Sequence, residues 1–292
     1  MPESSASPQD LAFATLQRLL PTRTLSALMF RIAEIRNRRF KDALIRRFMR
    51  HYPIDLREAE IEQAEQYANF NAFFTRALKP GSRTQPARAD VLSSPVDGTI
   101  SQFGKIAGDT LIQAKGHGYS AAELLADADL AAEFHDGDFC TIYLAPYNYH
   151  RVHAPYGGRL RSWTYVPGRL FSVNPATARA LPQLFARNER MVAVFDTDGG
   201  PLAVVMVGAL FVGGIETVWG GRLTPPHTRA PEPLHFGPMK PFDCARGDEL
   251  GRFFMGSTVI LLTPPGTTQW QVELAPAQAI RLGTPLADFR NP

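Results

Sequence analysis

From about Val91 onward, the chain is a series of short apolar runs separated by glycine and proline. Residues 139–144, 204–207 and 259–262 are typical, because each run is rich in β-branched, aromatic or other apolar side chains and is soon followed by a turn former. Runs of this length and composition predict β-strands. The sequence therefore predicts an α+β protein whose body is β-rich, either a sandwich or a barrel-like sheet, with an N-terminal helical segment before it.

The first 65 residues follow a different pattern. Apolar residues recur at helical spacing after Ser7-Pro8, again in a run for which Thr24 is the expected N-cap, and a third time from Phe40 onward. We therefore predict two parts: a basic amphipathic helical region at residues 1–65 and a β-rich domain at residues 66–292.

The charge of the head supports an anionic partner. Residues 1–50 contain ten Lys or Arg and four Asp or Glu, a charge of +6 in a chain of net charge +3. Helices with an apolar stripe and an arginine-rich face bind anionic membrane surfaces. The same stripe could instead pack on the rest of the protein, and the segment alone supports both interpretations equally. Nucleic acid is not the expected partner, since no aromatic–basic interleaving accompanies the charge.

Nothing in the sequence predicts a signal peptide or a membrane-spanning helix. The N-terminus is polar, and the uncharged run at residues 199–215 is interrupted by glycine and proline. That run is also shorter than the roughly 20 residues that cross a bilayer. Cys140 and Cys244 lack CxxC spacing and are expected to be reduced, which is consistent with a cytoplasmic environment.

Two histidines three residues apart, His150 and His153, lie in a dense polar and aromatic segment. The pair could be half of a metal site, although no further cysteine or histidine pair stands at ligand spacing. One of them could instead be a general base, or both could be structural. Asp97-Gly98, between two strand-like runs, by itself predicts a hairpin turn.

The Gly256-Ser257 step immediately precedes a strand-like run. A serine nucleophile needs a base, and the base needs a carboxylate that orients it; Asp97, His153 and Ser257 are candidates for these roles. An ordinary serine hydrolase is the weaker interpretation, because residues 255–259 lack the second glycine of Gly-x-Ser-x-Gly. The alternative function is a metal-dependent hydrolase that uses His150 and His153.

Several separated motifs occur in one order: Pro-Val-Asp-Gly at 95–98, Tyr-His-Arg-Val-His-Ala-Pro at 149–155 and Gly-Arg-Phe-Phe-Met-Gly-Ser-Thr at 251–258. In this combination the chain resembles the phosphatidylserine decarboxylases of bacteria and mitochondria. Residues 70–81 and 207–217 are also similar to segments of that family, so the resemblance covers about residues 66–290. Met255 stands where the family usually has leucine; it is apolar and of similar volume, so we expect it to be tolerated.

The resemblance implies a proenzyme that cuts itself. In this family the serine hydroxyl attacks the carbonyl of the preceding glycine, and elimination then splits the chain and leaves a pyruvoyl group. Carried over, the cut falls between Gly256 and Ser257 and gives a β chain, 1–256, and an α chain, 257–292. Ser257 becomes the covalent pyruvoyl cofactor. His153 would take the proton from Ser257, and Asp97 would orient His153.

The resemblance also implies the reaction and the partners. The pyruvoyl ketone forms a Schiff base with the amine of phosphatidylserine and accepts the electrons that departing carbon dioxide leaves behind, so the product is phosphatidylethanolamine. His150 is the candidate that returns a proton to the α-carbon, and no metal is expected. A lipid substrate favours the head as an anchor on an anionic membrane surface. We therefore expect a peripheral protein on the cytoplasmic face of the cell membrane; a homodimer is compatible with the sequence.

Overall fold

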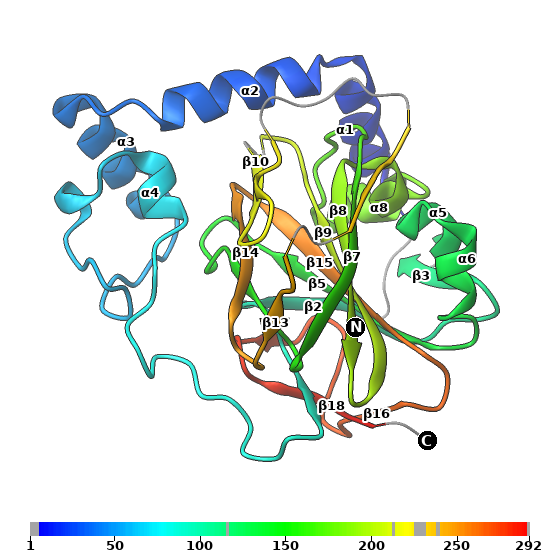
Figure 1. The fold of residues 1–292 in the computed structure, drawn as a ribbon. Coiled ribbons are helices and arrows are strands. Elements are labelled where there is room, and N and C mark those ends of the chain that lie inside the picture. The colour runs from blue at the N-terminus through cyan, green and yellow to red at the C-terminus, as the bar shows by residue number, and fades with distance from the viewer. Residues whose placement is uncertain (1–5, 115–116, 212–213, 225–231, 238–239, 291–292) are drawn as a thin grey trace.

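The computed structural model describes residues 6–114, 117–211, 214–224, 232–237 and 240–290. It confirms the predicted α+β fold, because helices lead the chain and antiparallel strands dominate the rest (Figure 1). The helices are α1 Pro8–Leu19, α2 Thr22–Ala33, α3 Arg38–His51, the 3-10 turn η1 Ala64–Gln66, α4 Phe70–Phe74, α5 Ala121–Leu125, α6 Ala128–Ala132, α7 Pro175–Ala180 and α8 Leu184–Arg187. The strands are β1 Val91–Ser93, β2 Gly98–Lys105, β3 Thr110–Ala114, β4 His117–Ser120, β5 Asp138–Leu144, β6 Arg151–His153, β7 Gly158–Val166, β8 Arg190–Thr197, β9 Gly200–Val207, β10 Gly214–Thr217, β11 Gly221–Arg222, β12 Leu234–Phe236, β13 Asp243–Cys244, β14 Glu249–Phe254, β15 Ser257–Thr263, β16 Thr268–Trp270, β17 Ala279–Ile280 and β18 Pro285–Phe289.

The largest sheet has the strand order β12-β7-β8-β9-β15-β5-β2-β17, and β13 also pairs with β7. Its centre is buried on both faces, and every residue of β15 is buried. This burial explains why the central strands are continuous apolar runs in the sequence rather than alternating ones. Smaller sheets have the orders β11-β10-β14-β6, β1-β18-β16 and β3-β4. Over the described residues, the sheets stay open and do not close into a barrel.

Three neighbouring strands of the large sheet are continuous along the chain with three neighbouring strands of the four-stranded sheet. β5 leads into β6, β9 into β10, and β14 into β15, so the order β9-β15-β5 matches the order β10-β14-β6. The link from β14 to β15 is short, because Phe254 still pairs with Gly214 and Ser257 already pairs with Leu144. Gly256 therefore lies in the middle one of three neighbouring links that connect the two sheets. Residues 212–213, within the family-like segment 207–217, lie outside the described residues.

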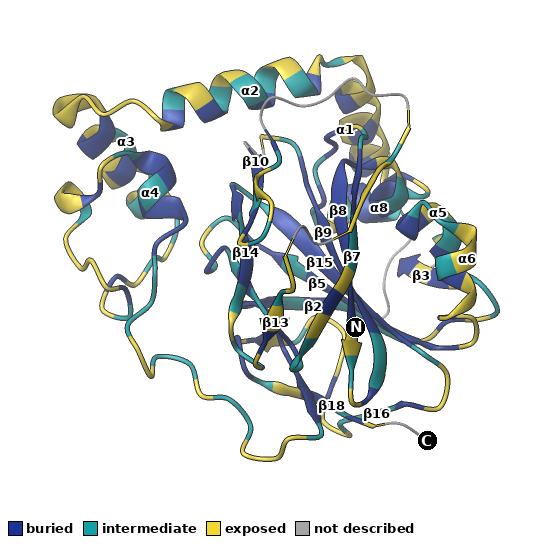
Figure 2. Cartoon of the chain, viewed as in Figure 1, coloured by how far each residue is buried: buried dark blue, intermediate teal, exposed yellow. Residues whose placement is uncertain are grey.

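Except for Phe30, the buried side chains of the first two helices are small or polar, and several large apolar ones are exposed. Figure 2 shows exposed and buried positions alternating along these helices. Gln17 of α1 accepts a hydrogen bond from the backbone of Ser172 at 2.7 Å, and Arg23 of α2 donates to the carbonyl of Gly168 at 2.7 Å. The exposed large apolar side chains among the described residues of the head are Leu11, Phe13, Leu16, Leu19, Leu28, Ile35, Phe40 and Ile61. The apolar residues that predicted these helices thus lie mostly on the face turned away from the body. No helix in the described part of the chain is long and apolar enough to cross a membrane.

The predicted N-cap at Thr24 is wrong. Helix α2 begins at Thr22, and Pro21 occupies the capping position without a side-chain hydrogen bond. Proline has a backbone φ close to the helical value, so the chain enters the helix two residues before the predicted cap.

A second, smaller apolar core lies between α3 and α4. It contains Ile45 of α3 and Phe73 and Phe74 of α4, and Met255 packs against it. Figure 1 shows these two helices set beside the sheets at the end of α2. Met255, which immediately precedes Gly256, therefore packs against a core that the head helps to build.

Candidate active site

The link between β14 and β15 has an unusual backbone. Met255 and Gly256 have φ angles of 84° and 25°. A positive φ is uncommon for a residue with a side chain, and such conformations persist only where the surrounding structure holds them. Here β10 and β6 hold β14, while β9 and β5 hold β15. A Cβ on Gly256 would meet no atom within 4 Å, so the space beside this residue is open.

Ser257 is the first residue of β15 and is fully buried. Its Oγ has no hydrogen-bond partner among the described residues. A buried hydroxyl without a partner costs free energy, so each instance in a folded protein needs an explanation. The step therefore combines a strained backbone with an unsatisfied nucleophilic oxygen.

His153, on β6, is held by two hydrogen bonds. Its Nδ1–H donates to the carbonyl of Gly247 at 2.7 Å, because a carbonyl oxygen can only accept. Nε2 is then the unprotonated nitrogen, and the Tyr149 hydroxyl donates to it at 3.0 Å. Burial lowers the pKa of His153, although the hydrogen bond to Gly247 and nearby carboxylates oppose the shift. The imidazole is therefore neutral at pH 7 and offers Nε2 as a base.

Asp97 lies beside this segment but forms its hydrogen bonds elsewhere. Its carboxylate accepts from both the Nε and an Nη of Arg83, at 2.9 and 2.5 Å, and from the backbone of Leu282 at 2.8 Å. The backbone of His153 donates to Pro95 at 2.9 Å, which keeps the two segments side by side. No hydrogen bond joins Asp97 to His153 within the described residues; the carboxylate acts on the imidazole only as a nearby charge.

His150 is completely buried in the turn between β5 and β6. Its ring stacks on Phe74 with centroids 4.1 Å apart, and Nε2–H donates to the carbonyl of Ala145 at 3.1 Å. Nδ1 therefore carries a lone pair, and it has no partner among the described residues. Burial, together with the charge of Arg76, lowers the pKa of His150 to about 3.

The sequence analysis did not find two arginines that shape this site. Arg83 holds Asp97, and it also pairs with Glu58 at 3.0 Å. Arg76 is buried, and one Nη donates to the carbonyls of Tyr147 and Asn148 at 3.3 and 3.4 Å. Its Nε and other Nη have no partner in the described part of the chain. For Arg76, the sequence offered one signal: it closely follows the aromatic stretch at 70–74, which was expected to pack on a core.

The imidazoles of His150 and His153 and the unpaired hydroxyl of Ser257 lie on or beside two neighbouring links between the sheets, and groups of this kind are characteristic of catalytic centres. The fold and the site therefore indicate an enzyme that uses acid–base chemistry. Within the described residues, no group of three or more His, Cys, Asp or Glu side chains could hold a metal ion. Cys140 and Cys244 are both free thiols.

Comparison with known proteins identifies the family. The family model described as phosphatidylserine decarboxylase matches residues 70–288, and a second model, described as PSD, matches residues 12–53. The chain is 50% identical over 282 residues to the phosphatidylserine decarboxylase proenzyme of Nitrosococcus oceani, covering 96% of this chain and 92% of that protein. It is 50% identical to the proenzyme of Pseudomonas paraeruginosa, covering 96% and 97%. It is 46% identical over 285 residues to that of Alcanivorax borkumensis, covering 97% and 98%.

The chain therefore belongs to the phosphatidylserine decarboxylase family. It is accordingly a decarboxylase, in the carboxy-lyase class of enzymes. The resemblance found in the separated motifs is confirmed.

We expect His150 to make the protein less stable as the pH falls. The imidazole has a pKa of 6.5 when unperturbed and about 3 in the fold, so between these values the unfolded chain binds the extra proton. Stability is therefore lost as the pH falls below 6.5, by about 2 kcal/mol at pH 5. Urea unfolding at pH 7 and pH 5 measures this loss. His150→Gln should lack this contribution, whereas His135→Gln, at an exposed position, should retain it; equal pH dependence in His150→Gln and the parent protein would contradict the assignment.

Proposed function

We propose that this protein decarboxylates phosphatidylserine to phosphatidylethanolamine after cutting its own chain between Gly256 and Ser257. The observation that carries the proposal is the buried, unpartnered Oγ of Ser257, next to two residues with positive φ, in a chain whose relatives are named proenzymes. Family membership also favours this reaction over the metal-dependent hydrolase considered from the sequence.

The proposed cut begins when Nε2 of His153 takes the proton of Ser257 Oγ. The oxygen adds to the carbonyl carbon of Gly256, the peptide C–N bond breaks, and an ester forms with a free amine on residue 257. Elimination then breaks the Cβ–Oγ bond and releases Gly256 as a carboxylate. Addition of water and loss of ammonia leave a pyruvoyl group at residue 257, with chains 1–256 and 257–292. The open space beside Gly256 supports this attack.

The hydrogen bonds of His153 refine the role of Asp97. Gly247, rather than Asp97, accepts the Nδ1 hydrogen bond that sets the tautomer. We therefore assign Asp97 an electrostatic role, in which its charge stabilises the imidazolium that forms when His153 takes the proton. In this structure the Tyr149 hydroxyl donates to Nε2, so that hydrogen bond must break before Nε2 can take the proton of Ser257.

Position 257 fits a covalent pyruvoyl group, because loss of the buried Oγ would break no side-chain hydrogen bond. Once formed, the group supplies a carbonyl that withdraws electrons from the substrate. His150 is the proposed proton carrier: the Nδ1 lone pair accepts a proton from the ammonium of the incoming lipid and returns it to the α-carbon after carbon dioxide leaves. Its low pKa makes the neutral ring a weak base for the first transfer and the protonated ring a strong donor for the second.

We propose that residues 1–65 bind the cytoplasmic surface of the cell membrane, while residues 66–292 carry the catalytic site. The exposed apolar side chains of α1 and α2 support this division, since their opposite faces already pack on the body. Arginines on the same helices suit anionic headgroups.

Intact mass measurement of the purified protein tests the cut. The expected result is two chains, 1–256 and 257–292, with the smaller chain blocked at its N-terminus. Ser257→Ala should give a single uncut chain without decarboxylase activity, because the attacking oxygen is gone. Ser101→Ala, in β2, should be processed as usual. An active preparation that consists of one uncut chain would refute the proposal.

His153→Ala should slow the cut by about 100-fold or more, since a positioned general base contributes rate factors of this size. The measurement is the disappearance of the precursor band with time after synthesis. His117→Ala, on β4, provides the control and should be cut at the normal rate. Normal cutting of His153→Ala would rule out this residue as the base.

Vesicles containing phosphatidylserine or phosphatidylglycerol should pull down the protein, and the bound fraction should fall as salt rises. Leu19→Gln should weaken binding, because this side chain is 80% exposed on α1. Val272→Gln provides the control, since Val272 is 96% exposed on the body. Binding that responds neither to salt nor to Leu19→Gln would argue against the head as the anchor.

A further inference from the structure

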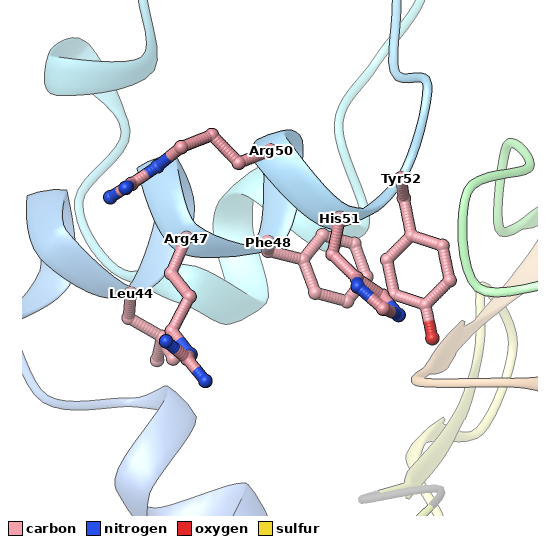
Figure 3. Close-up of a pocket in the computed structure, with 6 residues that line it drawn as sticks. All are labelled: Leu44, Arg47, Phe48, Arg50, His51 and Tyr52. Carbon is pink, nitrogen blue, oxygen red and sulfur yellow. The ribbon is translucent and has the colours of Figure 1, made fainter.

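The last two turns of α3 line a hollow of about 480 Å³ on the head. The lining residues are Leu44, Arg47, Phe48, Arg50, His51 and Tyr52. Figure 3 shows the rings of Phe48, His51 and Tyr52 gathered at one end, with Arg47 beside Leu44 at the other. The catalytic steps proposed above use none of these side chains.

Helix geometry gives the hollow two adjacent rows. Leu44 and Phe48 are four residues apart and form an apolar row, and Arg47 and His51, also four apart, form a basic row. Leu44 and Phe48 are half-buried, while Arg47 and His51 are exposed. A ligand that fits both rows has an anionic group next to an apolar one.

The positive charge of the hollow is not neutralised. Elsewhere on α3, Arg38 and Lys41 pair with Asp42, and Arg46 pairs with Glu65. In contrast, neither Arg47 nor Arg50 has a carboxylate partner within the described residues. The acidic side chains therefore compensate Arg38, Lys41 and Arg46, and leave the two arginines that line the hollow available for an anion.

The hollow is connected to the candidate active site through aromatic rings. Phe48 lies 6.0 Å from Phe74, and Phe74 stacks on His150 at 4.1 Å. On the neighbouring side, Tyr52 lies 6.3 Å from Tyr147, in the same turn as His150. One layer of rings thus separates the hollow from the proposed proton carrier.

We propose that this hollow binds the phosphodiester of a phospholipid headgroup. Arg47 and His51 donate hydrogen bonds to the phosphate oxygens, and Leu44 and Phe48 contact the glycerol and the first acyl carbons. This inference rests on the proposed function, because it names residues that would bind the lipid in that reaction. The phosphate contact would favour a lipid-linked serine over free serine.

The test uses the processed full-length enzyme and dihexanoylphosphatidylserine below the concentration at which it forms micelles, so that no membrane surface takes part. Arg47→Gln should raise KM about tenfold or more with little change in kcat, because it removes a charged contact that is equal in the ground and transition states. His51→Gln should shift KM in the same direction. Arg39→Gln is the matched control: it removes an exposed cation of α3 that does not line the hollow.

A second arm identifies the source of the phosphate. If the substrate's own phosphodiester binds, dihexanoylphosphatidylglycerol competes with it in the parent enzyme and competes less in Arg47→Gln. If a neighbouring anionic lipid binds, the same compound activates the parent enzyme, and Arg47→Gln loses that activation. An unchanged KM together with an unchanged response to dihexanoylphosphatidylglycerol in Arg47→Gln would overturn the proposal.

Failure of the proposed function would have a different signature. In that case the parent protein would release no carbon dioxide from any phosphatidylserine. Calorimetric titration with dihexanoylphosphatidylglycerol would still test the hollow: binding by the parent and Arg39→Gln proteins, but not by Arg47→Gln, supports it. Equal binding by all three proteins refutes it.

Discussion

The pairing of β15 between β5 and β9 is the constraint on which the rest of the site depends. Ser257 begins a strand that is fixed along both edges, while the residues just before it belong to a strand fixed in another sheet. The two residues between these strands must absorb the change of direction, and Met255 and Gly256 do so with positive φ. Backbone strain is thus concentrated at the peptide bond that we propose is cut.

The two histidines of the segment 149–155 are made different by their surroundings. His150 is completely buried and lies near the charge of Arg76, so its pKa falls to about 3. His153 is less buried and has carboxylates nearby, which oppose the fall in its pKa. Placing one imidazole in each environment would allow one motif to supply a base for the cut and a separate proton carrier for decarboxylation.

Much of the architecture could be predicted from the sequence, because buried strands such as β5, β9 and β15 are uninterrupted apolar runs. The separated motifs also identified the family. The face on which the head helices pack could not be predicted, since Ser26 is buried while Leu28 is exposed. An apolar stripe along a helix does not indicate whether the stripe packs on the protein or faces a membrane. Nor could the pairing of Asp97 with Arg83 be predicted, because it depends on how a loop folds back over 14 residues.

The position of β15 has a consequence for the unfolding of a mature enzyme. Once the bond before Ser257 is cut, the fragment that begins with β15 is joined to the other chain only by non-covalent contacts. Those contacts include strand pairing at the middle of the largest sheet and the pairs β1–β18 and β2–β17. Unfolding would then release two separate molecules, and refolding would require them to meet again. The lifetime of such an enzyme would be set by how slowly the central strand leaves the sheet, rather than by an equilibrium of a single chain.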